Sequence, residues 1–389
     1  MAALTSGCSA AQPAGNLPLT PLTAQRAVTG EEKTPLLLSP FSEPYPFQGS
    51  DSLTHLVYEI LLTNFSSGET TINGLQIRGA DGTVLKDLNQ SAAARQIQQI
   101  SSHTLTGTMA AGTESILFVD ITLPRGSAVP AKLSGLIKAH VAAAPPKMQD
   151  LTASLDVKVR PEQLPVLGAP LRGTNYVAGD ACCSLTHRRE VLPINGGMWL
   201  AQRFAIDWEQ TNSKGYIRSG PKEDPKSFKI FGNDVLAVTN ARVVSTIDGQ
   251  KEQTPGSFPK NITAAQADGN SIILDIGQGK YALYAHLKTG SIRVKVGDTV
   301  KKGQVLANVG NTGNSLAPHL HFQVMDRPSS LASNGLPYML ERFTLTGQST
   351  TDAFNAAEDE GKVLVKKPVE PNRQIRDAYP LDQNVVSLP

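Results

Sequence analysis

The chain has 389 residues, of which 40% are hydrophobic and 18% charged, and its formal net charge is +2. At about 150 residues per domain, this length predicts two or three domains. The balanced charge, with no dense basic block, argues against a nucleic-acid-binding protein. No apolar run approaches the ~18–20 residues of a membrane-spanning helix.

The amino-terminal stretch contains the first of three cysteines, Cys8. Residues 4–8, in which small residues precede this cysteine, resemble a bacterial lipobox, and the resemblance predicts an acylated Cys8 that attaches the protein to a membrane outside the cytoplasm. Neither a basic segment nor a full apolar segment precedes it, so an unmodified tail with one thiol is the alternative. Pro, Ser, Thr and Ala dominate residues 1–50, which we interpret as a tether and a lead-in segment.

Short apolar alternations separated by turn residues predict an all-β protein. Residues 51–160 carry such strands at 56–62, 72–77 and 116–121, which favours an immunoglobulin-like β-sandwich. A hairpin turn is expected at residues 79–82 and a short helical turn at 91–95.

The second half is also rich in predicted strands. Residues 161–185, with several Pro and Gly, are typical of a connection, and they end in the adjacent pair Cys182 and Cys183, which form either a disulfide or two thiols. Residues 186–345 form the second predicted domain, with strands near 236–238, 241–244, 271–276 and 281–284. Residues 346–389 are expected to be a surface extension that finishes as an edge strand near 384–386.

The strongest chemical signal is His319-Leu320-His321. In a strand, side chains at i and i+2 point to one face, so both imidazoles share a side. Two converging imidazoles suit a metal site, or a metal ligand beside a base. Taken alone, such a pair is more often an ordinary core or surface feature. Here a polar loop (311–318) precedes it, and His286 ends another apolar strand.

Together these stretches resemble the LytM/lysostaphin-type zinc metallopeptidases of peptidase family M23. The matching segments are residues 232–238, 284–287, 296–306 and 310–322. The resemblance implies an open antiparallel β-fold of the duplicated hybrid motif type with a groove, and hydrolysis of peptide cross-links in bacterial peptidoglycan with Zn²⁺ as cofactor.

The resemblance also assigns roles to residues. His321 matches a zinc ligand, and His319 and His286 match the catalytic histidines. The remaining two ligands lie in an upstream His-x-x-x-Asp motif, which corresponds here to residues 203–207. Asp207 matches the Asp ligand, but Arg203 stands where the His is expected. A guanidinium has no lone pair to offer a metal ion, so only two of the three expected ligands are identified.

Three explanations of this departure stay open. If another histidine of this domain replaces the ligand, it is His187, which lies far enough upstream for a strand–turn–strand return; its plain interpretation is a surface histidine in a basic loop. Alternatively, Cys182 or Cys183 supplies a thiolate. In the third explanation no metal binds, and Arg203 pairs with Asp207 on one strand face.

We therefore predict a zinc-dependent peptidoglycan endopeptidase of the periplasm or cell envelope, lipid-anchored if Cys8 is acylated. In it, His286 or His319 takes or returns a proton while zinc activates water. The alternative function is an inactive LytM-like module that binds the cell wall or activates a partner hydrolase. The presence of a third zinc ligand distinguishes the two functions.

Overall fold

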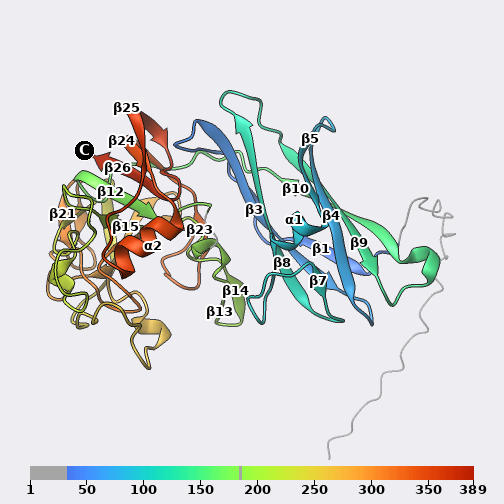
Figure 1. Cartoon of the computed structure of the whole chain (residues 1–389), viewed down its shortest axis with the longest axis horizontal. Helices are drawn as coiled ribbons and strands as arrows, with labels where there is room; N and C mark the ends of the chain where they lie inside the picture. Colours follow the sequence, from blue (N-terminus) through green and yellow to red (C-terminus); the bar gives the residue numbers. More distant parts are fainter. Residues whose placement is uncertain (1–32, 184–185) are drawn as a thin grey trace, which may run out of the picture. The chain divides into compact units, whose positions relative to one another are not determined.

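The computed structural model describes residues 33–183 and 186–389, and residues 35–389 form one compact unit. Nearly all of its regular structure is β-strand (Figure 1), which confirms the predicted all-β class. No helix in the described residues is both long enough and apolar enough to cross a membrane. The helical segments are α1 (Gln90–Ala94), α2 (Thr351–Asp359) and the 3-10 turns η1 (Pro146–Met148), η2 (His187–Arg189), η3 (Pro225–Ser227) and η4 (Ala264–Gln266).

The first half contains two five-stranded antiparallel sheets that enclose a common apolar core. Their inner faces contribute alternate apolar residues, such as Tyr58 and Ile60 from one sheet and Leu75 and Ile77 from the other. One sheet consists of β1 (Leu36–Pro40), β2 (Phe47–Gln48), β3 (Leu53–Asn64), β8 (Glu114–Pro124) and β6 (Ile97–Gln99). The other consists of β10 (Asp150–Lys158), β9 (Lys132–Val141), β4 (Thr70–Gly79), β5 (Val84–Asn89) and β7 (Thr108–Met109). We call this pair of sheets the sandwich; its immunoglobulin-like character stays a prediction.

Strand β8 is buried on both faces. Leu117, Val119 and Ile121 face the sandwich core, whereas Ile116 and Phe118 pack against Val191 and Leu200 of the second half. A strand covered on both sides needs a continuous apolar run, as residues 116–119 provide. The outer face of β8 is therefore a contact surface for the second half of the chain.

The second half is built on one twelve-stranded sheet. Its main path runs through β11 (Val166–Leu167), β24 (Met339–Gln348), β26 (Asn384–Leu388), β12 (Gly173–Gly179), β15 (Ile206–Gln210), β22 (Leu320–Met325), β19 (Lys280–Leu287), β18 (Asn270–Gly277), β17 (Ala241–Ile247) and β20 (Thr299–Val300). Beside this path, β23 (Gly335–Leu336) pairs with β22 and β25 (Lys367–Ala378) pairs with β24. Two small ladders join β13 (Leu192–Ile194) to β14 (Gly197–Trp199) and β16 (Asp234–Leu236) to β21 (Val305–Asn308).

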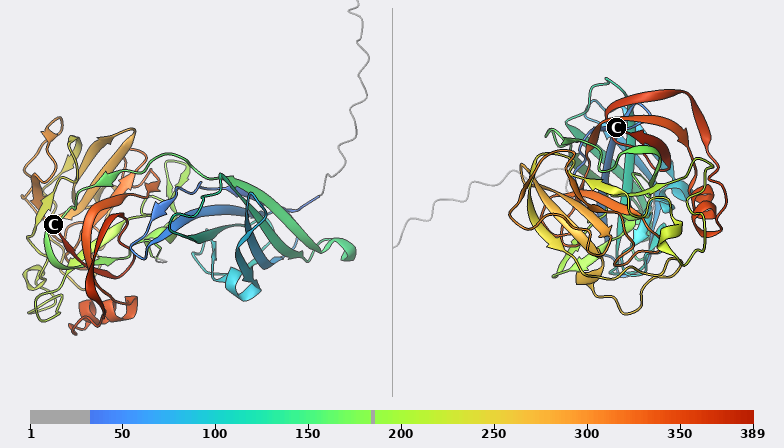
Figure 2. Two further views of the ribbon diagram at one scale, coloured as in Figure 1. Left: turned by 90° about the horizontal axis from the view of Figure 1, so that it is seen from above. Right: turned by 90° about the vertical axis from the view of Figure 1, so that its left-hand side faces the viewer.

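The carboxy-terminal segment corrects one sequence prediction. Strand β26 pairs with β24 on one side and β12 on the other, so it lies inside the sheet and not at an edge (Figure 1). The carboxy terminus, marked C in Figure 2, lies in the same half of the molecule as these strands. Val385 and Val386 are fully buried, because apolar side chains on both faces of an interior strand are covered. Strand β12, from the predicted connection, pairs in turn with β15, the strand that carries Asp207.

Candidate metal centre and catalytic groups

Three neighbouring strands bring the predicted site residues together. Asp207 on β15 is paired directly with His321 on β22, and His321 is paired with Ala285 on β19. Directly paired residues of antiparallel strands point to the same face, with Cβ atoms about 5 Å apart. This register places the Asp207 carboxylate beside the His321 ring.

His286 reaches the same place through a break in strand alternation. It follows Ala285, so regular alternation would turn its side chain to the opposite face of the sheet. Its φ of 59° is left-handed, and its backbone is held by hydrogen bonds from its N–H to Asp268 O and from Gly310 N–H to its carbonyl. The ring centroid lies 4.6 Å from that of His319 and 5.9 Å from that of His321. The unusual backbone therefore accompanies the placement of His286 in the cluster.

The Asp207 carboxylate lies at the centre of three imidazoles. His321 Nδ1 is 2.8 Å from Oδ1, His187 Nε2 is 3.3 Å from Oδ2, and His319 Nε2 is 3.5 Å from Oδ2. All three histidines are buried. His187, which lies in η2 with the β13–β14 hairpin between it and β15, thus stands beside Asp207 and not on a loop surface.

Backbone carbonyls define which nitrogen of three rings faces the cluster. Nδ1 of His187 donates to Asp180 O (3.1 Å), that of His319 to Ala317 O (2.7 Å) and that of His286 to Thr312 O (2.8 Å). A carbonyl only accepts, so each Nδ1 carries a hydrogen and Nε2 of the neutral ring presents its lone pair.

His321 has the opposite orientation because of Gln323. Its Nε2 donates to Gln323 Oε1 (2.8 Å), which leaves Nδ1 to present its lone pair toward Asp207. Gln323 is buried on β22, two residues from His321 and on the same strand face. Gln323 is not among the site residues expected from the sequence; its i+2 spacing from His321 is the signal that points to this role.

The donor atoms fit a zinc ion. One atom each from His187, Asp207 and His321 lie within 4.8 Å of one another, and a second group is formed by His286, His319 and His321. Neutral imidazole lone pairs facing a carboxylate repel it unless a proton or a cation lies between them. Two nitrogens and one carboxylate oxygen are the ligand types and number of a catalytic zinc site that keeps one open position.

The charges of the cluster favour bound positive charge. Burial opposes ionisation of Asp207, but His187, His319 and His321 hold the pKa of its carboxyl well below the usual range. Burial lowers the pKa of His187, yet the neighbouring Asp207 outweighs it and raises that pKa to about 9. Burial, His319 and His321 together hold the pKa of His286 well below its ordinary value, so the His286 ring is neutral.

Arg203 does not lie in this cluster, which corrects the predicted Arg203–Asp207 pair. It lies in the turn before β15 and is buried, with Nε 3.2 Å from Glu59 Oε2 and Nη2 donating to Val57 O at 3.1 Å. The correction has a simple cause: residue 203 precedes the strand, so i+4 spacing on a strand face does not apply to it.

The remaining sequence candidates lie elsewhere. Cys182 and Cys183 form a disulfide with each other, and Cys183 is near His55 and Asp120, not near Asp207. Both sulfurs are therefore absent from the cluster around Asp207. Cys8 lies outside the described residues.

A pair of carboxyl groups, one buried and one half-buried, adjoins the cluster and was not expected from the sequence. Glu209 lies on β15 two residues beyond Asp207, and its partner Glu358 belongs to α2 of the carboxy-terminal segment. Burial and the charge of Glu358 raise the pKa of Glu209 well above its usual value, and burial also raises that of Glu358. The pair therefore holds a proton more readily than exposed carboxyls do.

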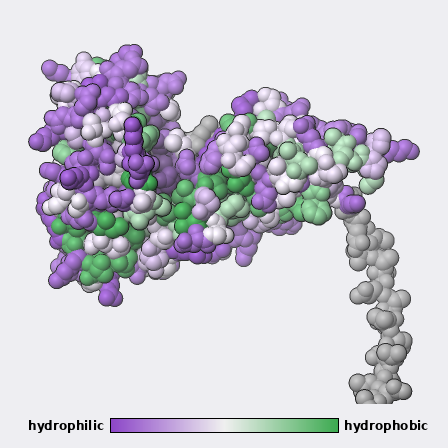
Figure 3. All heavy atoms as spheres, turned by 90° about the horizontal axis from the view of Figure 1, so that it is seen from below, coloured by the Kyte–Doolittle hydropathy of each residue, from purple (hydrophilic) through white to green (hydrophobic). Residues whose placement is uncertain are grey.

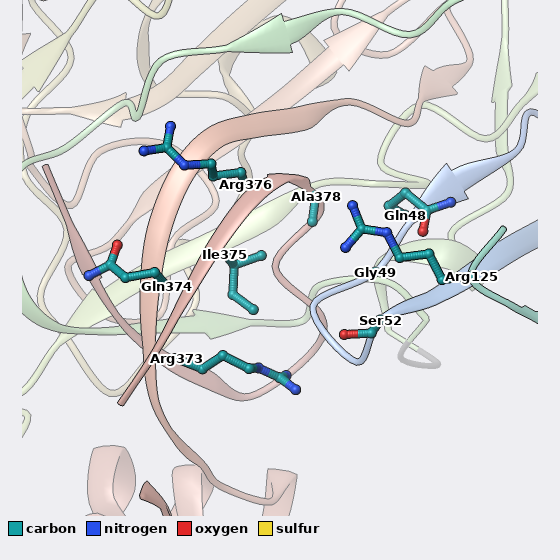
Figure 4. Close-up of a pocket in the computed structure, with 9 residues that line it drawn as sticks. All are labelled: Gln48, Gly49, Ser52, Arg125, Arg373, Gln374, Ile375, Arg376 and Ala378. Atoms are coloured by element: carbon teal, nitrogen blue, oxygen red, sulfur yellow. The ribbon is translucent and has the colours of Figure 1, made fainter. Parts of the chain in front are cut away.

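The histidine cluster does not line the large cavity of about 390 Å³ shown in Figure 4. That cavity lies between Gln48 and Ser52 of the sandwich and strand β25, with Arg125 and Arg373 beside it. Arg373 donates to the carbonyl of Ser50 and so ties the two walls together. Cavity size alone therefore does not identify the position of the histidine cluster in this protein.

Comparisons with known proteins agree with the geometry. Residues 229–333 match the sequence profile of peptidase family M23. The chain is 43% identical over 74 residues to the glycyl-glycine endopeptidase ALE-1 of Staphylococcus capitis, covering 18% of this chain and 20% of that protein. It is 38% identical over 71 residues to the peptidoglycan DD-endopeptidase ShyB of Vibrio cholerae, covering 18% and 16%. The match thus spans about a fifth of each relative.

Among solved structures, the catalytic domain of lysostaphin from Staphylococcus simulans aligns with 42% of this chain and 88% of its own, at 25% identity and a TM-score of 0.24. The profile match over residues 229–333 agrees with the resemblance to peptidase family M23 that the motifs of residues 232–322 predict. This matched segment contains His286, His319 and His321 but begins after His187 and Asp207.

Proposed function

We propose that this protein is a zinc-dependent endopeptidase that hydrolyses peptide cross-links of bacterial peptidoglycan. The observation that carries the proposal is the convergence of His187, Asp207 and His321 beside His286 and His319. Relatives named as glycyl-glycine and peptidoglycan DD-endopeptidases support the substrate class. Such a substrate places the protein outside the cytoplasm, where acylation of Cys8 would hold it at a membrane.

In this proposal His187 Nε2, an Asp207 carboxylate oxygen and His321 Nδ1 hold the metal. Zinc bound there supplies an acidified water and a polarised scissile carbonyl. Asp180 O and Gln323 Oε1 fix the two ligand rings, because each accepts the hydrogen of the nitrogen that does not face the metal.

His286 and His319 are the proposed proton-transfer groups. Each has its Nδ1 hydrogen bound to a backbone carbonyl, so its Nε2 is the atom that exchanges protons. A neutral Nε2 accepts a proton from the attacking water, and the imidazolium formed returns it to the departing amine. The short distance between the two rings allows them to divide these steps.

The test is the zinc content of the purified protein, measured together with release of cross-link fragments from peptidoglycan. We expect about one zinc per chain in the wild type, loss of zinc and activity in His187→Ala, and retention of both in His140→Ala, a control at a partly exposed histidine of β9. Cys183→Ser should also keep its zinc, since the sulfur is not near Asp207.

Two results would change the proposal. Zinc retained in His187→Ala would reject His187 as a ligand. A wild type that takes up no zinc after supplementation and releases no fragments would contradict the enzyme and favour a binding module.

A further inference from the structure

The short turn that carries His187 is fastened to the sandwich. Arg188, the next residue, donates from Nε to Glu59 Oε1 (2.9 Å) and from Nη2 to Tyr58 O (3.1 Å) and Val119 O (2.7 Å). All three acceptors lie on β3 or β8. Arg188 is buried, so these three hydrogen bonds take the place of the water that an exposed guanidinium would bind.

The neighbouring residue strengthens the same attachment. Arg189 Nη2 donates to Arg95 O (2.7 Å), and Gln98 Nε2 donates to the Arg189 carbonyl (3.0 Å). The guanidinium carbons of Arg188 and Arg189 lie 5.4 and 5.3 Å from the centre of the Phe118 ring on β8. Cation–π contacts of this kind add to the hydrogen bonds where water is excluded.

Glu59 is the carboxylate that pairs directly with both Arg188 and Arg203. Its side chain is fully buried in the middle of β3, and its second oxygen, Oε2, faces Arg203 Nε at 3.2 Å. Burial opposes the charge of Glu59, but Arg203 and Arg188 hold the pKa of its carboxyl below the usual value. Removing the charge would leave two buried guanidiniums without the carboxylate that pairs directly with both, which is strongly unfavourable.

The Glu59 carboxylate thus forms ion pairs with two arginines that are each connected with an unusual feature of the site. Arg203 is the residue that stands at the expected ligand position, and Arg188 belongs to the turn that brings His187 to Asp207. Consecutive Cα atoms are 3.8 Å apart, so a shift of Arg188 moves His187 with it. Within its own half of the chain, the His187 ring is oriented by Asp180 O.

We propose that Glu59 is a positioning residue for the metal centre: through Arg188 it holds His187 in place, so the sandwich completes a site whose other ligands lie in the second half. This inference rests on the proposed function, because it takes His187 as a zinc ligand. It gives the sandwich a defined task, and it explains how the site can do without a histidine at position 203.

The experiment measures zinc affinity by chelator competition in the full chain, for wild type, Glu59→Gln and Arg188→Lys. Glu59→Gln keeps the size of the side chain and removes its charge, and Arg188→Lys keeps the charge and removes the forked donor. Glu114→Gln is the matched control, since Glu114 lies on the same sheet and bonds to Thr63 Oγ1 away from the turn. We expect about 10–100-fold weaker zinc binding in the first two variants and no change in the control.

A Co²⁺-substituted sample supplies a second measurement that a change in stability alone would not alter. Displacement of His187 should change the visible absorption of bound Co²⁺ in Arg188→Lys, and this variant decides the question if Glu59→Gln does not fold. Wild-type zinc affinity and an unchanged Co²⁺ spectrum in the folded variants would overturn the inference and leave the proposed function standing. A wild type that binds no zinc would instead overturn the proposed function.

Discussion

At the scale of single residues, each histidine ring of the cluster is oriented by a hydrogen bond from the ring nitrogen that points away from the cluster. Three rings donate from Nδ1 to backbone carbonyls, and His321 donates from Nε2 to Gln323. These partners determine which nitrogen of each ring faces the cluster, Nε2 in three rings and Nδ1 in His321, which residue type alone leaves open.

A His286→Ala variant tests whether proton transfer and zinc binding are performed by different residues. His286 is not among the three proposed ligands, so the variant should keep its zinc and lose about 10²–10⁴-fold in kcat, the usual contribution of general acid–base catalysis. Zinc content and the rate of peptidoglycan hydrolysis measure the two effects. Loss of zinc in this variant would contradict the assigned ligand set.

Gln323 is expected to act through His321. Gln323→Leu removes the acceptor of the Nε2 hydrogen while keeping a buried side chain of similar length, and zinc affinity should fall about 10–100-fold. Chelator competition measures the change. An affinity equal to the wild type would show that Gln323 does not orient the ring.

At the scale of elements, two glycines interlock the loops that support His286. Gly269 and Gly313 have φ of 63° and 77°, and a Cβ on either would collide with the backbone of the other loop. Between them lies Thr312, whose carbonyl accepts from His286 and whose hydroxyl bonds to Leu287 O and Asn270 N. Close approach of the two backbones therefore positions the carbonyl that accepts the hydrogen bond from His286, a proposed proton-transfer group.

Gly313→Ala should lower the free energy of unfolding by about 2–4 kcal/mol, because it adds both an unfavourable φ and a collision. Gly303→Ala is the control: its φ of 81° is similar, but its Cβ would meet nothing within 4 Å, so the cost should be about 1 kcal/mol. Denaturant unfolding of both variants gives the difference. Equal costs would show that the loops separate without penalty.

At the scale of the whole molecule, polar groups buried between distant segments link stability to pH. His55 on β3 has Nε2 3.2 Å from Asp51 and Nδ1 3.8 Å from Asp120, and its ring stacks on Phe47. Burial lowers its pKa, but hydrogen bonds and the charges of the two carboxylates outweigh burial and raise it to about 9.

Since the folded-state pKa of His55 exceeds its ordinary value of 6.5, its charged form stabilises the fold fully below pH 6.5 and loses this contribution as pH rises through about 9. Wild-type Tm should therefore fall more steeply between pH 6.5 and 9 than that of His55→Gln. The comparison removes the contribution of His187, which is common to both proteins. Parallel Tm curves would contradict the assigned role of His55.

The face of the molecule shown in Figure 3 carries several hydrophobic patches. Hydrophobic residues there occur in groups interrupted by hydrophilic ones. Large exposed apolar side chains, such as Phe65 and Val365, lie far apart in the sequence. Individual exposed apolar side chains are ordinary on a folded protein surface.

The sequence by itself determined the all-β class, the hairpin at residues 79–82, the helical turn at α1 and the resemblance to family M23 over residues 229–333. These features follow from local patterns: alternation with a period of two, turn residues and short motifs. It also nominated His187, Asp207, His286, His319 and His321, whose roles stay a proposal.

Only the tertiary structure decided where Arg203 points, that Gln323 orients His321, and that β26 lies inside the sheet. It also joined Glu59 to Arg188, 129 residues away. The physical reason is that a buried charge pairs with the counter-ion that tertiary packing places beside it. Likewise, a strand pairs with the neighbours that satisfy its backbone hydrogen bonds and cover its apolar faces. Neither choice is made by the residues next to it in the chain.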